Sequence, residues 1–153
     1  MFSKVLVANR GEIAVRIIRS LRELGIKSVA IYSTADRDSL HVQLADEAVC
    51  VGGSRPQDSY LNMQNILAAA IGTGAQAIHP GFGFLSENAA FAEMCEACGI
   101  VFIGPKALTI DLMGNKEHAR EQMKKSGIPV IPGSDGYLSN VESAKQAAAA
   151  IGY

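Results

Sequence analysis

Five short apolar segments, separated by longer amphipathic ones, divide the first 104 residues into alternating predicted strands and helices. Short apolar runs in which polar and apolar residues do not alternate are typical of strands buried on both faces of a sheet. Strict alternation with short connections predicts right-handed βαβ crossovers. We therefore expect an α/β fold with a five-stranded parallel sheet and helices on both faces. The predicted strands are Lys4–Asn9, Lys27–Ser33, Glu47–Val51, Ala75–Ile78 and Ile100–Ile103.

The first predicted helix, Gly11–Leu24, has one apolar and one charged face. Its apolar residues recur at i, i+4, i+8 and i+11 and form the expected core stripe, Ile13, Ile17, Leu21 and Leu24. The opposite face is charged, and two of its pairs have the i,i+4 spacing of helix ion pairs. A solvated face is the ordinary interpretation of such charges. They are Glu12, Arg16, Arg19, Arg22 and Glu23.

Three more helices complete the predicted alternation. One covers Ser39–Ala45, with Ser39 as its cap. The next starts at Ser59 or Tyr60 and runs through Ile71, ended by Gly72 and Gly74, and the last covers Glu87–Cys98. The residues expected to face inward from the middle helix are Leu61, Ile66, Leu67 and Ala70.

The pattern changes after Pro105, where helices follow one another without an intervening strand. Helices are predicted at Ala107–Leu112 and Lys116–Ser126, followed by an extended connector and the turn-rich segment 133–136. Asn140 is the predicted cap of a last, alanine-rich helix that ends at Gly152. Residues 105–153 contain no segment long enough to form a sheet. We expect a domain boundary at 104/105 and a second domain that is cut short.

Composition excludes several classes of protein. The net charge of −1 provides no broad basic field for nucleic acid, and no apolar run is long enough to cross a membrane. The residues before the first predicted strand have neither the apolar region nor the cleavage site of a signal peptide, so we expect none. Three cysteines without a secretory signal argue against a disulfide framework. Cys95 and Cys98 fall in the last turn of a predicted helix, and we expect buried or half-buried thiols without a function. These features favour a cytoplasmic protein that binds neither nucleic acid nor membrane.

The segment His79–Asn88 is the most distinctive loop of the chain. Pro80, Gly81 and Gly83 allow a close approach of the backbone to a ligand, and Phe82 and Phe84 provide two aromatic rings. The loop follows a predicted strand, which is where open α/β sheets bind their ligands. A tight connection with two core phenylalanines explains the same residues, so both interpretations remain open at this point.

Other candidate sites carry weaker signals. The turn after the first strand contains a single glycine, Gly11, where a dinucleotide fingerprint has three, although Asp36 could imitate its ribose-binding acid. Lys116, just after Gly114, is placed where a cation could reach a nucleotide phosphate, but a lone lysine is more often a surface residue. His79 has no neighbour at metal-ligand spacing.

Taken together, five motifs resemble the N-terminal part of biotin carboxylases, which are ATP-grasp enzymes. The motifs occur in the family's order along the whole chain: VLVANRGEIA at 5–14, ADRD at 35–38, HPGFGFLSEN at 79–88, FIGP at 102–105 and DLMGNK at 111–116. The resemblance implies that residues 1–104 form a Rossmann-like, pre-ATP-grasp domain, without a dinucleotide. Residues 105–153 would be the truncated beginning of the ATP-grasp domain.

The resemblance also assigns roles to individual residues. Lys116 matches a lysine that contacts ATP, and Phe82 and Gly83 match a loop on the biotin side of the active site. Many family members have tyrosine at position 82, so a hydroxyl contact would be missing here while ring stacking remains. Arg19 and Glu23, with Arg16 beside them, match the family's homodimer interface, so we expect this helix face to be interfacial.

The family's reaction uses ATP with Mg²⁺, bicarbonate and biotin carried by a biotin carboxyl carrier protein. In the family, the glycine-rich lid, the metal ligands and the catalytic residues lie beyond position 153, so we expect no catalytic residue and no metal ligand in this chain, no tight cofactor binding and no activity of the chain alone. The tract at 41–50 is similar to the separate subunit of bacterial acetyl-CoA carboxylase, which works with carboxyltransferase subunits in fatty-acid synthesis. The same segment of pyruvate or another acyl-CoA carboxylase, and a non-catalytic nucleotide-binding module, are the alternatives.

Overall fold

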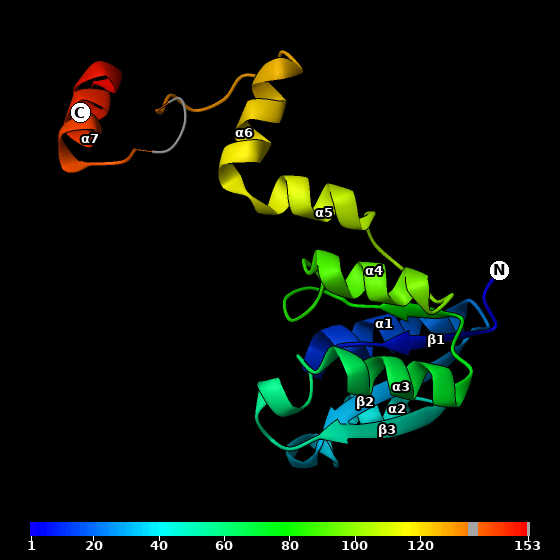
Figure 1. Cartoon of the computed structure of the whole chain (residues 1–153). Helices are drawn as coiled ribbons and strands as arrows, with labels where there is room; N and C mark the ends of the chain where they lie inside the picture. Colours follow the sequence, from blue (N-terminus) through cyan, green and yellow to red (C-terminus); the bar gives the residue numbers. More distant parts are fainter. Residues whose placement is uncertain (135–137, 153) are drawn as a thin grey trace. The chain divides into compact units, whose positions relative to one another are not determined.

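The computed structural model describes residues 1–134 and 138–152, and it divides into two compact units, Met1–Asp111 and Leu112–Tyr153. The first unit is built on a five-stranded, all-parallel sheet with strand order β3-β2-β1-β4-β5 (Figure 1). This confirms the predicted sheet, and each predicted strand end lies within two residues of the observed one. The strands are β1 (Lys4–Val7), β2 (Lys27–Ser33), β3 (Glu47–Gly52), β4 (Ala77–His79) and β5 (Val101–Phe102).

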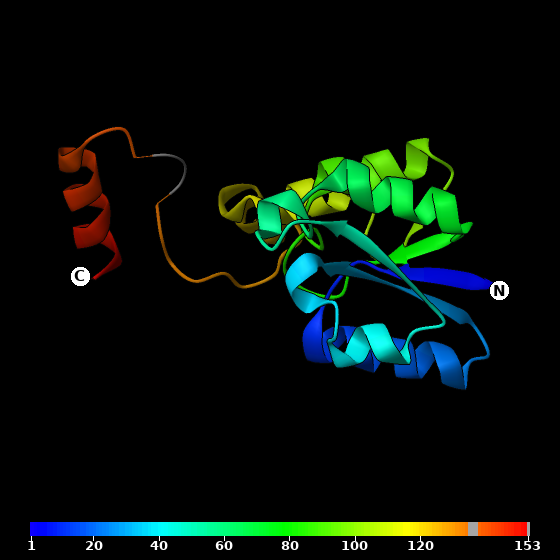
Figure 2. The ribbon, with the colours of Figure 1, turned by 90° about the horizontal axis from the view of Figure 1, so that it is seen from below.

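Helices cover both faces of this sheet, and Figure 2 shows the two helical layers on opposite sides of it. The helices α1 (Gly11–Glu23) and α2 (Leu40–Leu44) lie on one face, and α3 (Met63–Thr73) and α4 (Ala89–Ala97) lie on the other. Alternate residues of β1 point to the two layers. Val5 and Val7 pack with α1, whereas Leu6 packs with α3 and α4. Burial on both faces is therefore the reason that this strand reads as a continuous apolar run.

Two expectations about α3 are wrong. The helix starts at Met63 instead of Ser59 or Tyr60, because the side-chain oxygen of Asn62 accepts a hydrogen bond from the amide of Asn65 (3.0 Å) and caps it there. Leu61 lies outside the helix and is 36% exposed instead of facing inward. The other three residues, Ile66, Leu67 and Ala70, are buried as predicted.

Smaller corrections concern helix ends and thiols. Asn88 caps α4 through the amide of Phe91, so that helix also starts two residues later than predicted, and the side chain of Ser39 makes no cap to α2. Leu24 follows the end of α1 and is 62% exposed. Cys95 is buried, and burial raises the pKa of its thiol to about 11. Cys98 is exposed, contrary to expectation, and Cys50 is exposed as well.

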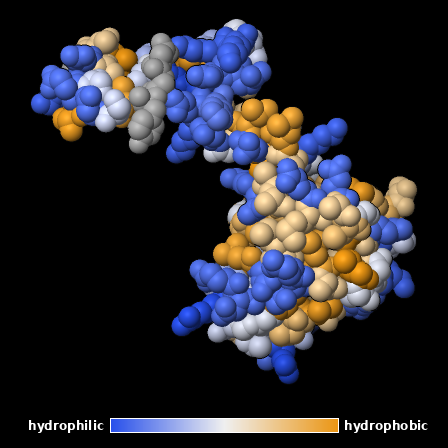
Figure 3. Space-filling model, viewed as in Figure 1, coloured by the Kyte–Doolittle hydropathy of each residue, from blue (hydrophilic) through white to orange (hydrophobic). Residues whose placement is uncertain are grey.

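The remaining helices are α5 (Ala107–Gly114), which spans the boundary of the two units, α6 (Lys116–Lys125) and α7 (Val141–Ile151). Asn140 caps α7 through the amide of Ser143, as predicted. In the described part of the chain, every buried apolar residue lies at or before Ile110, and the face of the second unit that Figure 3 shows is mostly hydrophilic. Two residues of the predicted 133–136 turn, Asp135 and Gly136, lie outside the described residues. The assignment of residues 105–153 to an ATP-grasp domain remains a prediction.

Within the described residues, no helix combines the length and the apolar character needed to cross a membrane.

Candidate functional site

The loop after β4 lies at the point where the strand order of the sheet reverses. From β1 the chain continues to β2 and β3 on one side of the sheet, while β4 and β5 extend it on the other side. Connections from neighbouring strands therefore diverge between β1 and β4, and open α/β sheets bind ligands at the carboxyl ends of strands at such a point. The loop after β4 meets Asn9, two residues beyond the end of β1, at this point, since the side chain of Asn9 donates to the carbonyl of Pro80.

The backbone of this loop has an unusual conformation. Gly81 and Gly83 have left-handed φ angles of 66° and 67°, and Phe84, a residue with a side chain, has φ 43°. A Cβ atom on Gly81 would lie 2.7 Å from Nδ2 of Asn9, so glycine is required there for space as well as for conformation. A strained residue such as Phe84 persists only where its surroundings determine its position.

The two phenylalanines of the loop have opposite surroundings. The side chain of Phe82 is 63% exposed, and Gly83 beside it is also exposed. Phe84 is half-buried and stacks on the buried Tyr60, with a distance of 5.2 Å between ring centroids. The loop is therefore both a structural connection and a presented surface: Phe84 anchors it, and Phe82 is available to a ligand or partner.

Phe82 also lines an apolar groove of about 600 Å³ on the α1 side of the sheet. The groove brings Phe82 together with Arg16, a residue predicted from the family resemblance to lie at a dimer interface. Arg19 and Glu23 are exposed on the same helix. Neither Glu12–Arg16 nor Arg19–Glu23 forms an ion pair within 4.0 Å in the described part of the chain. These charges are consequently free of the intrahelical partners that their spacing predicted.

A polar network beside the loop was not predicted from the sequence. The hydroxyl of Tyr60 donates to Oδ2 of Asp36 (2.6 Å) and accepts from the amide of Ser33 (2.9 Å), and the hydroxyl of Ser33 donates to the same carboxylate (2.9 Å). Arg10 Nη1 lies 3.6 Å from this oxygen. Burial raises the pKa of Asp36, but the hydrogen bonds from Tyr60 and Ser33 and the charge of Arg10 outweigh it and hold that pKa below 3.8.

This network bears on the dinucleotide interpretation of the first turn. The carboxylate of Asp36 is engaged by its own chain, so it is not presented to a ribose as the acid of a dinucleotide fingerprint would be. Tyr60 could have been suspected from the sequence, since a buried tyrosine needs a partner for its hydroxyl. Its partner could not, because Asp36 lies 24 residues away along the chain.

Lys116 is the first residue of α6 and is exposed. Asn115 caps this helix by accepting hydrogen bonds from the amides of Glu117 and His118. A helix N-terminus with a lysine in its first turn is suited to an anionic group such as a phosphate. Across residues 1–134 and 138–152, no three His, Cys, Asp or Glu side chains form a cluster of possible metal ligands.

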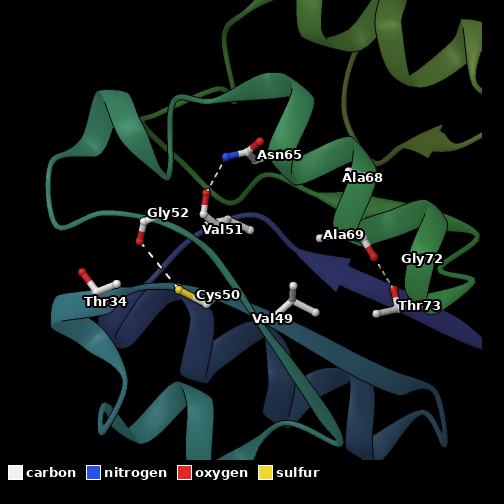
Figure 4. Close-up of a pocket in the computed structure, with 10 residues that line it drawn as sticks. All are labelled: Thr34, Val49, Cys50, Val51, Gly52, Asn65, Ala68, Ala69, Gly72 and Thr73. Carbon is white, nitrogen blue, oxygen red and sulfur yellow. Dashed lines mark hydrogen bonds between the residues drawn. The ribbon is translucent and has the colours of Figure 1, made fainter.

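A second groove, of about 720 Å³, lies between the edge strand β3 and α3 (Figure 4). None of the ten residues that line it carries a charge. Two of its polar side chains donate to the neighbouring backbone: Asn65 to the carbonyl of Val51 (2.8 Å) and Thr73 to that of Ala69 (2.7 Å). The groove contains none of the predicted site residues, and the loop after β4 remains the better candidate site.

Comparisons with known proteins agree on one family. Residues 1–110 match the family described as the N-terminal domain of biotin carboxylase. The chain is 59% identical over 153 residues to biotin carboxylase 1 of Bacillus subtilis, covering 100% of this chain and 34% of that protein.

Solved structures support the same assignment. The biotin carboxylase domain dimer of Hydrogenobacter thermophilus 2-oxoglutarate carboxylase, in complex with MgADP, ADP and bicarbonate, superposes with a TM-score of 0.95 at 55% identity. The biotin carboxylase subunit of a pyruvate carboxylase superposes with a TM-score of 0.85 at 59% identity. Both matches cover 100% of this chain and 34% of the other, so the chain spans about a third of the length of these relatives. The chain therefore belongs to the biotin carboxylase family, and its first 110 residues match that family's N-terminal domain.

Proposed function

We propose that this chain acts as the N-terminal part of a biotin carboxylase, an ATP-dependent ligase. In the proposed reaction, ATP phosphorylates bicarbonate to give carboxyphosphate and ADP. The carboxyl group then passes to the ureido nitrogen of carrier-bound biotin, with release of phosphate and of the nitrogen's proton. The observation that carries the proposal is the loop after β4, which holds Phe82 exposed at the switch point of the sheet.

The proposed roles of the site residues follow from their positions. Phe82 and Gly83 would form one wall for the bicyclic ring system of biotin, since an exposed aromatic ring beside a glycine offers a flat apolar surface. Lys116 would contact ATP from the start of α6. The residues that hold Mg²⁺ and complete phosphoryl transfer would come from outside this chain. Because one lysine neutralises little of the charge of a transferring phosphoryl group, we expect the chain alone to be inactive.

We propose that the charged face of α1 forms a homodimer interface. Arg16, Arg19 and Glu23 are exposed without intrahelical ion pairs, and an apolar groove with Arg16 at its edge adjoins them. Apolar surface bordered by unpaired charges is typical of protein–protein contacts. The relative from Hydrogenobacter thermophilus is described as a dimer. Further partners would be the biotin carboxyl carrier protein and carboxyltransferase subunits.

For the pathway, we propose the separate subunit of an acetyl-CoA carboxylase, which supplies malonyl-CoA for fatty-acid synthesis. The similarity of residues 41–50 to such subunits supports this choice. A pyruvate or other acyl-CoA carboxylase is the alternative, because relatives from pyruvate and 2-oxoglutarate carboxylases are 59% and 55% identical to this chain. Copurification distinguishes them: an acetyl-CoA-specific carboxyltransferase should accompany the protein in its own organism.

A hybrid enzyme tests the proposed function. Residues 1–153 of this chain would replace the matching N-terminal third of Bacillus subtilis biotin carboxylase 1, to which they align over their whole length. We expect ATP hydrolysis that depends on both bicarbonate and free biotin, and none from the 153-residue chain alone. A folded hybrid without this activity would contradict the proposal. A binding module for NAD would instead be indicated if calorimetry on the chain showed tight binding of NAD and none of ATP.

A further inference from the structure

The side chain of Asn9 joins the end of β1 to the loop after β4. Its Nδ2 donates to the carbonyl of Pro80 (2.7 Å) and to the carbonyl of Phe82 (2.8 Å), and its Oδ1 accepts from the amide of Arg10 (2.9 Å). The residue is only 3% exposed. All three of these hydrogen bonds are at least partly buried. Losing the first two leaves two carbonyl groups poorly satisfied, and losing the third leaves an amide N–H poorly satisfied. The two loop carbonyls flank Gly81, whose missing Cβ makes room for Asn9.

Arg10 holds the other end of the same loop. Its guanidinium carbon lies 5.5 Å from the ring centroid of Tyr60 and 5.6 Å from that of Phe84. These two rings stack on each other, and Asp36 binds the tyrosine hydroxyl and faces the guanidinium. A planar cation over two aromatic faces restrains Phe84, the loop residue with the left-handed φ angle.

The two attachments leave Phe82 between them and exposed. Asn9 holds the carbonyl of Phe82, and the stacked ring of Phe84 holds the chain two residues later. Within the described residues, the ring of Phe82 takes part in none of the ring–ring or cation–ring contacts. A binding surface binds its ligand more tightly when its conformation is fixed in advance, because the conformational entropy of the loop is then not lost on binding. The loop is built in this way.

We propose that Asn9 and Arg10 are positioning residues for biotin: together they pre-order the 80–84 backbone so that Phe82 and Gly83 present a fixed wall to the ring system. The inference rests on the proposed function for its ligand, but the pre-ordering itself is a property of this chain. Neither residue would touch ATP or the reacting atoms. The variants that remove each attachment should therefore affect the use of biotin and leave the use of ATP nearly unchanged.

Two substitutions separate positioning from general stability. Asn9→Asp keeps the shape and the oxygen that accepts from Arg10 but removes the two donors to the loop. Its matched control is Asn62→Asp, which keeps the accepting oxygen that caps α3. Arg10→Lys keeps the positive charge near Asp36 but loses the planar group over the rings, and its control is Arg37→Lys at an exposed position. Arg10 is half-exposed, so its variant tests the inference even if Asn9→Asp does not fold.

The first readout is hydrogen exchange in the 153-residue chain. The amides of Gly81, Ser86 and Asn88 form hydrogen bonds within or beside the loop and report on its order. In Asn9→Asp and Arg10→Lys we expect them to exchange at least about tenfold faster, with β1 and β2 amides unchanged. Unchanged loop amides in both variants would overturn the inference, as would an equal loss of protection in the sheet.

The second readout is steady-state kinetics of the hybrid enzyme. We expect each variant to raise KM for free biotin about fivefold or more while KM for ATP stays within about twofold, and the two controls to match the parent. A rise in both KM values, or in neither, would refute a positioning role toward biotin. If the parent hybrid is inactive, the proposed function fails separately, and the exchange measurement still decides whether Asn9 and Arg10 order the loop.

Discussion

At the scale of single residues, Tyr60 links the loop after β2 to the loop after β4. Its ring stacks on Phe84, and its hydroxyl serves as a donor to Asp36 and as an acceptor for the amide of Ser33. Burial, followed by the hydrogen bond to Asp36, raises the pKa of Tyr60 to about 12, so the hydroxyl keeps its proton and its donor role at any physiological pH.

Tyr60→Phe should therefore destabilise the protein. The substitution keeps the stacked ring, but the amide of Ser33 loses its acceptor and the carboxylate of Asp36 loses one of its donors. We expect a loss of about 1–3 kcal/mol in the free energy of unfolding. Urea denaturation followed by circular dichroism measures it. Tyr32→Phe, at a half-buried tyrosine on β2, is the control and should change stability by less than about 0.5 kcal/mol. Equal effects of the two substitutions would contradict the role assigned to the Tyr60 hydroxyl.

Two histidines make the stability of the first unit dependent on pH. Burial lowers the pKa of His41 and of His79 below the usual 6.5. Nδ1 of His79 accepts from the amide of Gly81 (3.0 Å), which requires that this nitrogen carry no proton. In the unfolded chain both residues bind protons near pH 6.5, before the folded state does. Stability is therefore fully present above this pH and is lost as the pH falls toward the folded-state pKa values.

We expect a lower urea midpoint at pH 5 than at pH 7, and a smaller difference in the His41→Gln/His79→Gln double variant. His118→Gln, at an exposed position on α6, is the control that should keep the full difference. If the double variant keeps the full difference between pH 5 and pH 7, titratable groups other than His41 and His79 cause the pH dependence.

At the scale of secondary-structure elements, two glycines with different surroundings test the packing of β3 and α3. Gly52 ends β3 with a φ angle of 148°, and a Cβ there would lie 1.8 Å from the carbonyl oxygen of Asp58. Gly52→Ala should destabilise the protein by more than about 3 kcal/mol, because both the conformation and the space exclude a side chain.

Gly72→Ala is the matched substitution within α3. A Cβ at this position meets nothing within 4 Å, so alanine should stabilise the protein by about 0.5–1 kcal/mol through its helix propensity. The two variants, compared by urea denaturation, should thus change stability in opposite directions. A loss of stability in Gly72→Ala would show that the helix packs more closely there than the structure indicates.

The elements differ in how far they could be predicted from sequence. Strands such as Lys27–Ser33 were predictable because a strand that is buried on both faces has a continuous apolar sequence. This local pattern can be recognised without knowing which elements pack against the strand. The start of α3 was not, since Tyr60 precedes the helix and points into the core, and Asn62 competes for the cap. The Asn9 bonds to Pro80 and Phe82 join residues 71 and 73 positions apart, which no local pattern contains.

At the scale of the whole molecule, the two units should differ in local stability. The buried apolar residues described belong to the first unit, whereas α7 has none of its own. Helices of this length depend on packing for most of their stability. We expect the amides of α7 to exchange at least about a hundredfold faster than those of β1 and β2 in the 153-residue chain. Similar protection in both would show that α7 is packed as firmly as the sheet.

The family assignment leaves one central claim to test, namely that the loop after β4 faces biotin rather than ATP. The most direct measurement is the pair of KM values for biotin and ATP in the hybrid enzyme carrying Phe82→Ala, with Phe82→Tyr as the control that keeps the ring. Loss of an exposed stacking surface should raise KM for biotin about fivefold to thirtyfold and leave KM for ATP within about twofold, while Phe82→Tyr keeps KM for biotin at or below the parent value. A rise in KM for ATP with KM for biotin unchanged would contradict the account.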